Sequence, residues 1–301
     1  MNKTKGILLT IFAAVGFGFQ GFLAKTAYAN GFNPYSFTLY RSLFAAVALF
    51  IFIKLYNLDL EVTKAQYKTL FKVSLFGYSI MLVILYISFL YMPTGLAMTL
   101  HFVYPVFVML SSVFLYKEKI GPKKVLALIL SISGIYFLMG FGSFSNISML
   151  GFWLALISGI LYSYYILMVS NSNIKDLNSF VITFYLSLFN TFIVFALTLV
   201  TGNISLNYNY KGLLSTIMVA LICNIFGMVS FQAGLKYITA TTSSILSTFE
   251  PITSLIVGIL VFNEFLAWYH FAGSILIIVS VILVSLAEKR LAEVADKSKI
   301  S

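Results

Sequence analysis

The sequence predicts an all-α membrane protein of ten transmembrane helices, arranged as two inverted five-helix repeats. Three observations carry this prediction: an excess of apolar residues, ten apolar segments of membrane-spanning length, and a weak internal repeat. Of the 301 residues, 60% are hydrophobic and only 9% are charged, and the mean hydropathy is +0.99. A soluble domain carries roughly 25% charged residues. The main solvent of this chain is therefore lipid, and the bilayer is its first expected partner.

Ten segments satisfy the requirement of about 20 apolar residues for a helix that crosses a bilayer. Turn-forming residues separate the first two of them, at Asn30-Gly31 and Asn33-Pro34. The residues that follow Ala287 are rich in charge and predict a short tail, 288–301. The ten predicted spans are 6–28, 35–55, 69–91, 94–116, 123–141, 149–170, 178–201, 211–235, 239–261 and 267–287.

The distribution of cations predicts the orientation of these spans. If the N-terminus is cytoplasmic, 16 of the 19 Lys and Arg residues lie on the cytoplasmic side, and only Lys25, Arg41 and Lys211 lie toward the outside. Positive charge concentrates in cytoplasmic loops of membrane proteins. We therefore expect both termini to be cytoplasmic and the protein to be a multi-pass protein of the plasma membrane. The same loop pattern explains the net charge of +10 without nucleic acid as a partner.

The two halves of the chain resemble each other at a nearly constant offset. Gly6 aligns with Gly151 at an offset of 145 residues, and Tyr91, Pro105 and Glu118 align with Tyr237, Pro251 and Glu264 at an offset of 146. Because each half holds five spans, the second half must cross the membrane with opposite polarity. Inverted repeats of this kind build alternating-access transporters with the substrate site near the midplane. The predicted units are 1–141, 149–287 and the tail.

The residues that carry this repeat also resemble a known family. The glycines of the first span (Gly16, Gly18, Gly21), Arg41 in the second span, and the matching stretches 90–118 and 235–264 are similar to the EamA-type transporters of the drug/metabolite transporter superfamily. The resemblance covers nearly the whole chain. It implies ten helices around a central cavity, and the export of amino acids, other metabolites or toxic compounds. It does not identify the cargo.

Polar residues inside the predicted spans are the candidate substrate-binding residues, because polar groups are costly toward lipid. Ser243, Ser247 and Glu250 share one face of the ninth span, and His101 and Tyr104 occupy the equivalent face of the fourth. Tyr78 and Tyr86 of the third span correspond to Asn224 and Gln232 of the eighth. The complete candidate set is Gln20, Tyr40, Arg41, Tyr78, Tyr86, His101, Tyr104, Tyr162, Tyr165, Asn224, Gln232, Ser243, Ser247 and Glu250.

Glu250, Arg41 and the tyrosines of this set allow more than one role. Glu250, near the middle of the ninth span, is expected either to bind a substrate amine, to exchange a coupling proton, or to bond the backbone freed by Pro251. Arg41 is expected to attract an anion or to form an internal pair. Each tyrosine is equally compatible with packing or with the membrane interface. Pro105 and Pro251 interrupt helical hydrogen bonding and are the candidate hinges.

The sequence argues against other function classes. One cysteine, Cys223, and two histidines, His101 and His270, do not make a metal site, and no cofactor is expected. No Walker A loop is present, so transport would be secondary or facilitated. An intramembrane enzyme would need a nucleophile paired with a base, and the helical positions offer none. A channel-like facilitator and a structural membrane subunit remain the alternatives to a transporter. A small-molecule substrate, a coupling proton or ion, and a second copy of the chain are the expected partners besides lipid.

Overall fold

The structure, a computed structural model, describes residues 3–92, 94–138, 148–262 and 268–297. These residues form helices joined by short loops, which confirms the all-α prediction. The first half comprises α1 (Lys3–Phe17), α2 (Gln20–Ala29), α3 (Pro34–Leu55), α4 (Lys64–Lys72), η1 (Val73–Ile80), α5 (Met81–Tyr91), α6 (Thr94–His101), α7 (Tyr104–Tyr116) and α8 (Pro122–Leu138). The second half comprises α9 (Met149–Asn171), α10 (Ser179–Thr201), α11 (Tyr210–Val219), η3 (Ala220–Gly227), α12 (Met228–Leu235), α13 (Ala240–Leu246), η4 (Ser247–Phe249), α14 (Glu250–Phe262) and α15 (Trp268–Lys297).

Seven helical stretches of the described residues are long and apolar enough, by length and composition, to cross a membrane. The other three predicted spans are shorter or interrupted: α6 and α7 are separated at Phe102-Val103, α8 has 17 residues, and η4 divides α13 from α14. Those three therefore remain predictions as spans. The seven stretches are Lys3–Ala29, Pro34–Leu55, Lys64–Tyr91, Met149–Asn171, Ser179–Thr201, Tyr210–Leu235 and Trp268–Ala287.

Local sequence explains where several helices begin. The Asn33 side chain caps α3 by accepting a hydrogen bond from the Ser36 N–H at 2.8 Å, and Pro34 occupies the first turn, where its missing N–H has no consequence. Thr63 and Gln66 form a reciprocal capping box at the start of α4. Such caps satisfy backbone donors that would otherwise lie unpaired at the membrane boundary.

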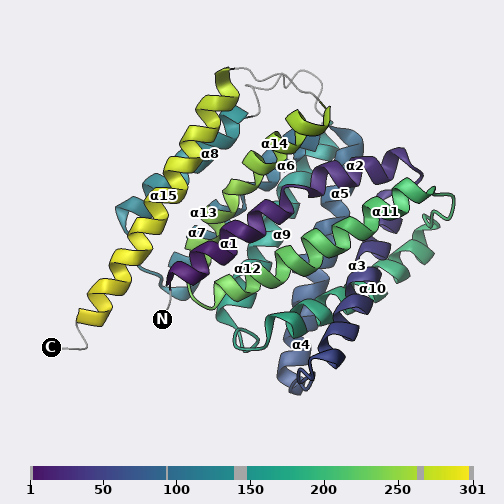
Figure 1. Cartoon of the computed structure of the whole chain (residues 1–301), viewed down its shortest axis with the longest axis horizontal. Helices are drawn as coiled ribbons and strands as arrows, with labels where there is room; N and C mark the ends of the chain where they lie inside the picture. The colour runs from purple at the N-terminus through teal and green to yellow at the C-terminus, as the bar shows by residue number, and fades with distance from the viewer. Residues whose placement is uncertain (1–2, 93, 139–147, 263–267, 298–301) are drawn as a thin grey trace.

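Helices of one half pack against helices of the other (Figure 1). Helix α1 lies along η3 and α12, and the equivalent α9 lies along η1 and α5. The repeat-matched residues make the same contact twice. A Cβ at Gly6 would lie 2.7 Å from Cβ of Tyr237, and one at Gly151 would lie 2.9 Å from Cβ of Tyr91. Small residues permit this close approach of membrane helices. The two halves are therefore interlocked around a shared interior.

Hydrogen bonds between loops gather them at two ends of the molecule. At the end where α1 begins, which we call the N-terminal end, Gln66 Nε2 donates to the Asn173 carbonyl at 3.2 Å and Lys236 Nζ donates to the Leu177 carbonyl at 2.6 Å. At the opposite end, the Asn209 N–H donates to the Asn30 carbonyl at 3.1 Å. Helix α15 ends at the N-terminal end, and it packs on α8 at the side of the bundle (Figure 1).

Large apolar side chains cover the outer surface. Phe114, Val200, Leu260 and Ile275 are between 60% and 86% exposed. A water-soluble surface rarely carries so many exposed large hydrophobic side chains in contiguous patches, whereas the same side chains are favourable against acyl chains. The polar residues of the spans lie inside instead, among them Arg41, Asn190, Asn224 and Gln232.

Two segments of π-helix occupy equivalent places in the halves. Segment η1 holds Tyr78, and segment η3 holds Asn224, the residue that aligns with Tyr78 in the repeat. π-helical segments are rare and occur frequently at functional sites. Neither was expected from the sequence, because an apolar helix with a widened turn has no distinctive composition.

Candidate functional site

A small, partly open cavity of about 40 Å³ lies between the halves, at the middle of the bundle. Its polar wall contains six of the predicted substrate-binding residues. Its apolar wall is formed by Phe17, Met81, Leu82, Leu85, Met98 and Met228. The six polar residues are Gln20, Arg41, Tyr78, His101, Tyr162 and Glu250.

Arg41 is held in place by residues from three other spans. Its side chain is only 2% exposed. Its Nε donates to Asn224 Oδ1 at 3.0 Å and its Nη2 donates to the same oxygen, while Nη1 donates to the Tyr86 hydroxyl and, at 3.4 Å, to Gln20 Oε1. These partners are neutral, and among the described residues no carboxylate lies within ion-pairing distance of Arg41. The guanidinium is therefore oriented and hydrogen-bonded, but its charge is not neutralised.

Glu250 is the acidic residue of the same cavity. It begins α14, is 8% exposed, and faces the same cavity as Arg41. No hydrogen bond or ion pair joins its carboxyl group to another described residue. A buried carboxylate without a partner is costly in a membrane interior. The cavity is thus bounded by one fixed cation and one acid that do not contact each other, so each is available to a bound solute.

Aromatic rings surround the acidic side of the cavity. The ring of His101 lies 5.3 Å from that of Tyr162 and 5.6 Å from that of Tyr104, and Tyr104 meets Tyr162 edge-on at 4.8 Å. His101 Nδ1 lies 2.9 Å from the Ser158 hydroxyl, which itself donates to the Ala155 carbonyl. Because the Ser158 hydroxyl donates its proton to Ala155, the hydrogen bond between Ser158 and His101 has Nδ1 as its donor. Nε2 is then the unprotonated nitrogen of the neutral imidazole. The electron-rich faces of such rings attract cations.

The two predicted hinge prolines follow interruptions of their helices. Pro105 is the second residue of α7, just after the break at Phe102-Val103, and Pro251 is the second residue of α14, just after η4. Proline cannot donate to the carbonyl four residues earlier and clashes with it. The breaks thus lie at repeat-equivalent positions beside the cavity. Whether they act as hinges remains a prediction. Glu264, which aligns with Glu118, lies outside the described residues.

The remaining predicted site residues are farther from the cavity wall. Tyr86 and Asn224 contact Arg41, and Tyr165 accepts a hydrogen bond from Gln232 Nε2 at 3.0 Å. Ser243 and Ser247 are buried in α13 and η4, one to two turns from Glu250. Tyr40 is different, because it packs against Phe32 and Tyr208 toward the opposite end of the molecule. The structure therefore does not bring Tyr40 to the cavity.

Sequence reasoning missed the apolar wall and the Ser158 hydroxyl. The three methionines and Phe17 carry no pattern that separates an inward residue from one that faces lipid, because both environments are apolar. Ser158 could have been found, since it is a hydroxyl in the interior of a predicted span. Methionine is unbranched and adapts to irregular shapes, which suits a wall that must accommodate a solute.

Replacing Gly159 with alanine is expected to lower the thermal stability of the purified protein. The added Cβ would lie 2.5 Å from the His101 carbonyl oxygen, so α9 and α6 would have to separate. Overpacking of this kind costs about 1–3 kcal/mol. Gly121→Ala is the matched control, because nothing lies within 4 Å of its added atom. Equal melting temperatures of the two variants, measured by intrinsic fluorescence in detergent, would contradict the close packing of these helices.

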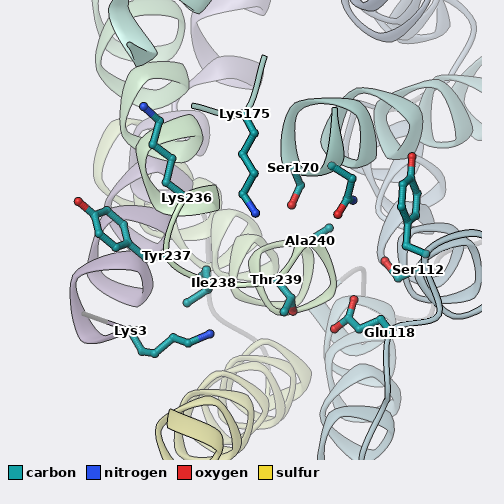
Figure 2. Close-up of a pocket in the computed structure, with 12 residues that line it drawn as sticks. Lys3, Ser112, Glu118, Ser170, Lys175, Lys236, Tyr237, Ile238, Thr239 and Ala240 are labelled. Atoms are coloured by element: carbon teal, nitrogen blue, oxygen red, sulfur yellow. The ribbon is translucent and has the colours of Figure 1, made fainter. Parts of the chain in front are cut away.

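A second, larger hollow of about 260 Å³ lies at the N-terminal end (Figure 2). We call it the lysine pocket, because Lys3, Lys175 and Lys236 line it. The rest of its wall comes from the ends of α7 and α9 and from the segment that joins α12 to α13. Glu118 also reaches it, but both oxygens of this carboxylate are occupied: Lys124 Nζ donates to Oε1 at 3.2 Å, and the Thr241 hydroxyl donates to Oε2 at 2.8 Å.

Comparison with solved structures gives the same architecture. One structure, described only as a crystal structure of a protein, matches with a TM-score of 0.78 and 14% sequence identity, and the match covers 96% of this chain and 99% of the other. At this identity the likeness shows the fold alone. No curated protein matches the sequence.

Comparison with family models is more specific. The model described as the EamA-like transporter family matches the sequence twice, over residues 4–140 and 149–286, so the model matches each half of the chain once. The match covers most of the chain, and residues 141–148 separate the two copies. Together with the apolar helices and the interlocked halves, it places the protein in a family: this chain is a multi-pass membrane protein that belongs to the EamA-like transporter family.

Proposed function

We propose that the protein is a secondary transporter that exports a small organic solute, such as an amino acid or a drug-like compound, by alternating access around the central cavity. The observation that carries the proposal is that a buried guanidinium and a buried carboxyl group line one cavity without contacting each other. Arg41 and Glu250 both line it, and no ion pair joins them. Burying ionisable groups without a charged partner lowers stability, which is expected where a bound solute completes the pairing.

The wall suits a solute with an anionic end, a cationic end and an apolar body. Arg41 and Gln20 would face a carboxylate, whereas Glu250, His101 and Tyr162 would face an ammonium group. The methionine and leucine side chains would contact the apolar part. Binding sites of this type are mostly apolar, with a few polar groups that fix orientation.

The size of the cavity supports a conformational cycle. A space of about 40 Å³ is far smaller than sites for small molecules, which usually span about 300–1,000 Å³. The halves must therefore separate before a metabolite enters. The helix breaks before Pro105 and Pro251 lie where such a movement would bend the chain.

The loop contacts support the ten-span topology with both termini in the cytoplasm. The segments after the predicted second, fourth, sixth and eighth spans meet at the N-terminal end, as in the hydrogen bond from Lys124 Nζ to Thr239 Oγ1 at 3.1 Å. The segments after the first and seventh spans meet at the opposite end. Alternating passages through the membrane would produce this arrangement, and the lysine excess supports a cytoplasmic N-terminal end.

Flux measurements in proteoliposomes test the proposal. A carrier is expected to show saturable uptake of radiolabelled amino acids or amines, and counterflow when unlabelled solute is trapped inside. Empty liposomes and liposomes with heat-inactivated protein are the controls. Flux that rises linearly with concentration, without counterflow, would identify a channel-like facilitator instead. No flux of any solute across a broad panel, from correctly folded protein, would favour a structural subunit.

A further inference from the structure

The lysine pocket is lined by residues of both halves at the N-terminal end. Lys3 comes from the first span, Ser112 from the end of α7, Ser170 from the end of α9, and Ala240 from the start of α13. From Ala240 the chain runs through α13 and η4 to Glu250, which lines the central cavity. One helical segment therefore contributes to the walls of both hollows.

The lysine pocket is lined by three lysines and one carboxylate, Glu118. Figure 2 shows Lys3, Lys175 and Glu118 extending toward the middle of the hollow. Because Glu118 is paired with Lys124, its charge is largely compensated. Burial lowers the pKa of Lys236 below its ordinary value, although the Asp176 carboxylate opposes this effect. The Lys175 ammonium makes no hydrogen bond or ion pair with another described residue.

Hydroxyl groups without partners accompany these cations. Ser112 is 2% exposed and lines the pocket, and its Oγ has no hydrogen-bond partner among the described residues. The same is true of Ser243 Oγ, one turn below Ala240 in α13. A buried hydroxyl that lacks a partner destabilises the protein. These two groups mark positions where a solute or water molecules would supply the missing hydrogen bonds.

Ammonium and hydroxyl donors around a hollow are the groups that recognise a carboxylate or a phosphate. We propose that the lysine pocket binds the anionic group, carboxylate or phosphate, of a solute that travels between the N-terminal end and the central cavity. The anionic group would then pass from the lysines of the pocket, along the unpartnered hydroxyls, to Arg41. This inference deepens the proposed transport function, because it selects solutes that carry a negative group.

Binding can be tested without transport. The full chain is placed in nanodiscs of phosphatidylcholine, its lysines are ¹³C-methylated, and their signals are followed while inorganic phosphate or acetate replaces chloride at constant ionic strength. The signals of Lys175 and Lys236 are expected to shift saturably. Lys175→Gln should weaken binding by about tenfold, and Lys175→Arg should restore most of it. Lys64→Gln, at an exposed lysine of the same end, should change the affinity by less than about twofold.

The other outcomes separate the competing explanations. Shifts that appear only when phosphatidylglycerol is added, and that phosphate does not reverse, would overturn the proposal by identifying a lipid headgroup as the occupant. Lysine signals that respond to neither anion would overturn it as well. If phosphate binds at Lys175 while proteoliposomes show no flux, the transport proposal is wrong but the anion-binding proposal is supported. If flux is saturable but the signals of Lys175 and Lys236 do not shift, only the anion-binding proposal is wrong.

Discussion

Replacing Asn224 with leucine is expected to cause a large loss of stability. The amide oxygen of Asn224 accepts from both Nε and Nη2 of Arg41, and its Nδ2 donates back to the Arg41 carbonyl at 3.4 Å. Without it, a guanidinium that is always charged would keep two buried N–H groups with no acceptor. Removing one partner of a buried charge costs about 3–5 kcal/mol. Thermal unfolding in detergent, followed by circular dichroism, measures the effect.

The matched controls use the same pair of residues. Arg41→Met removes the charge and leaves only neutral groups unpaired, so it is expected to be the milder change. The double variant, Arg41→Met with Asn224→Leu, should be more stable than Asn224→Leu alone, because no guanidinium is left without its acceptor. Strictly additive effects of the two substitutions would show that Arg41 and Asn224 do not interact in the folded protein.

Replacing Glu250 with glutamine is expected to reduce the transport of amine-bearing solutes by about thirtyfold or more. The substitution keeps the shape of the side chain but removes the only acid on the cavity wall among the described residues. Losing one partner of a desolvated charge pair weakens binding by about 2–5 kcal/mol, and each 1.4 kcal/mol is a factor of ten. Initial rates of uptake in proteoliposomes, measured over a range of solute concentrations, give the change in kcat/KM.

The way in which Glu250→Gln fails distinguishes the two roles of this residue. If Glu250 binds the amine, both counterflow and proton-driven accumulation should be lost. If it carries a coupling proton, counterflow should persist and accumulation against a gradient should stop. Glu61→Gln, at an exposed carboxylate of the loop before α4, is the control and should transport normally. Normal transport by Glu250→Gln at every pH would eliminate both roles.

The sequence could predict which residues turn inward, but it could not predict how they combine. Polar side chains are costly against acyl chains, so Gln20, Arg41 and Glu250 had to be interior, and six of the candidates indeed share one cavity. The partners of Arg41 could not be foreseen. Asn224 is 183 residues away along the chain, and no pattern within a single helix indicates which residue of another helix it contacts.

The lysine pocket could not be predicted from the sequence either. In the sequence, Lys175 and Lys236 indicate only orientation, because a cation at a helix end is usually a topology signal. Their convergence with Ser112 depends on how α7, α9 and α13 end beside one another. The repeat offset could predict that the fourth and ninth spans are equivalent, but not that a hollow lies between their ends.

The sequence by itself determined the solvent, the helical class, the repeat and the family, because apolar run length and residue offset are properties that a linear pattern records. It also limited the polar candidates to a short set. Only the tertiary structure decided that Arg41 and Glu250 face one cavity without touching, that π-helical segments contribute to it, and that three lysines converge on a second hollow. The physical reason is that such contacts depend on the relative positions of helices far apart in the chain, which side-chain packing and hydrogen bonding set only on folding.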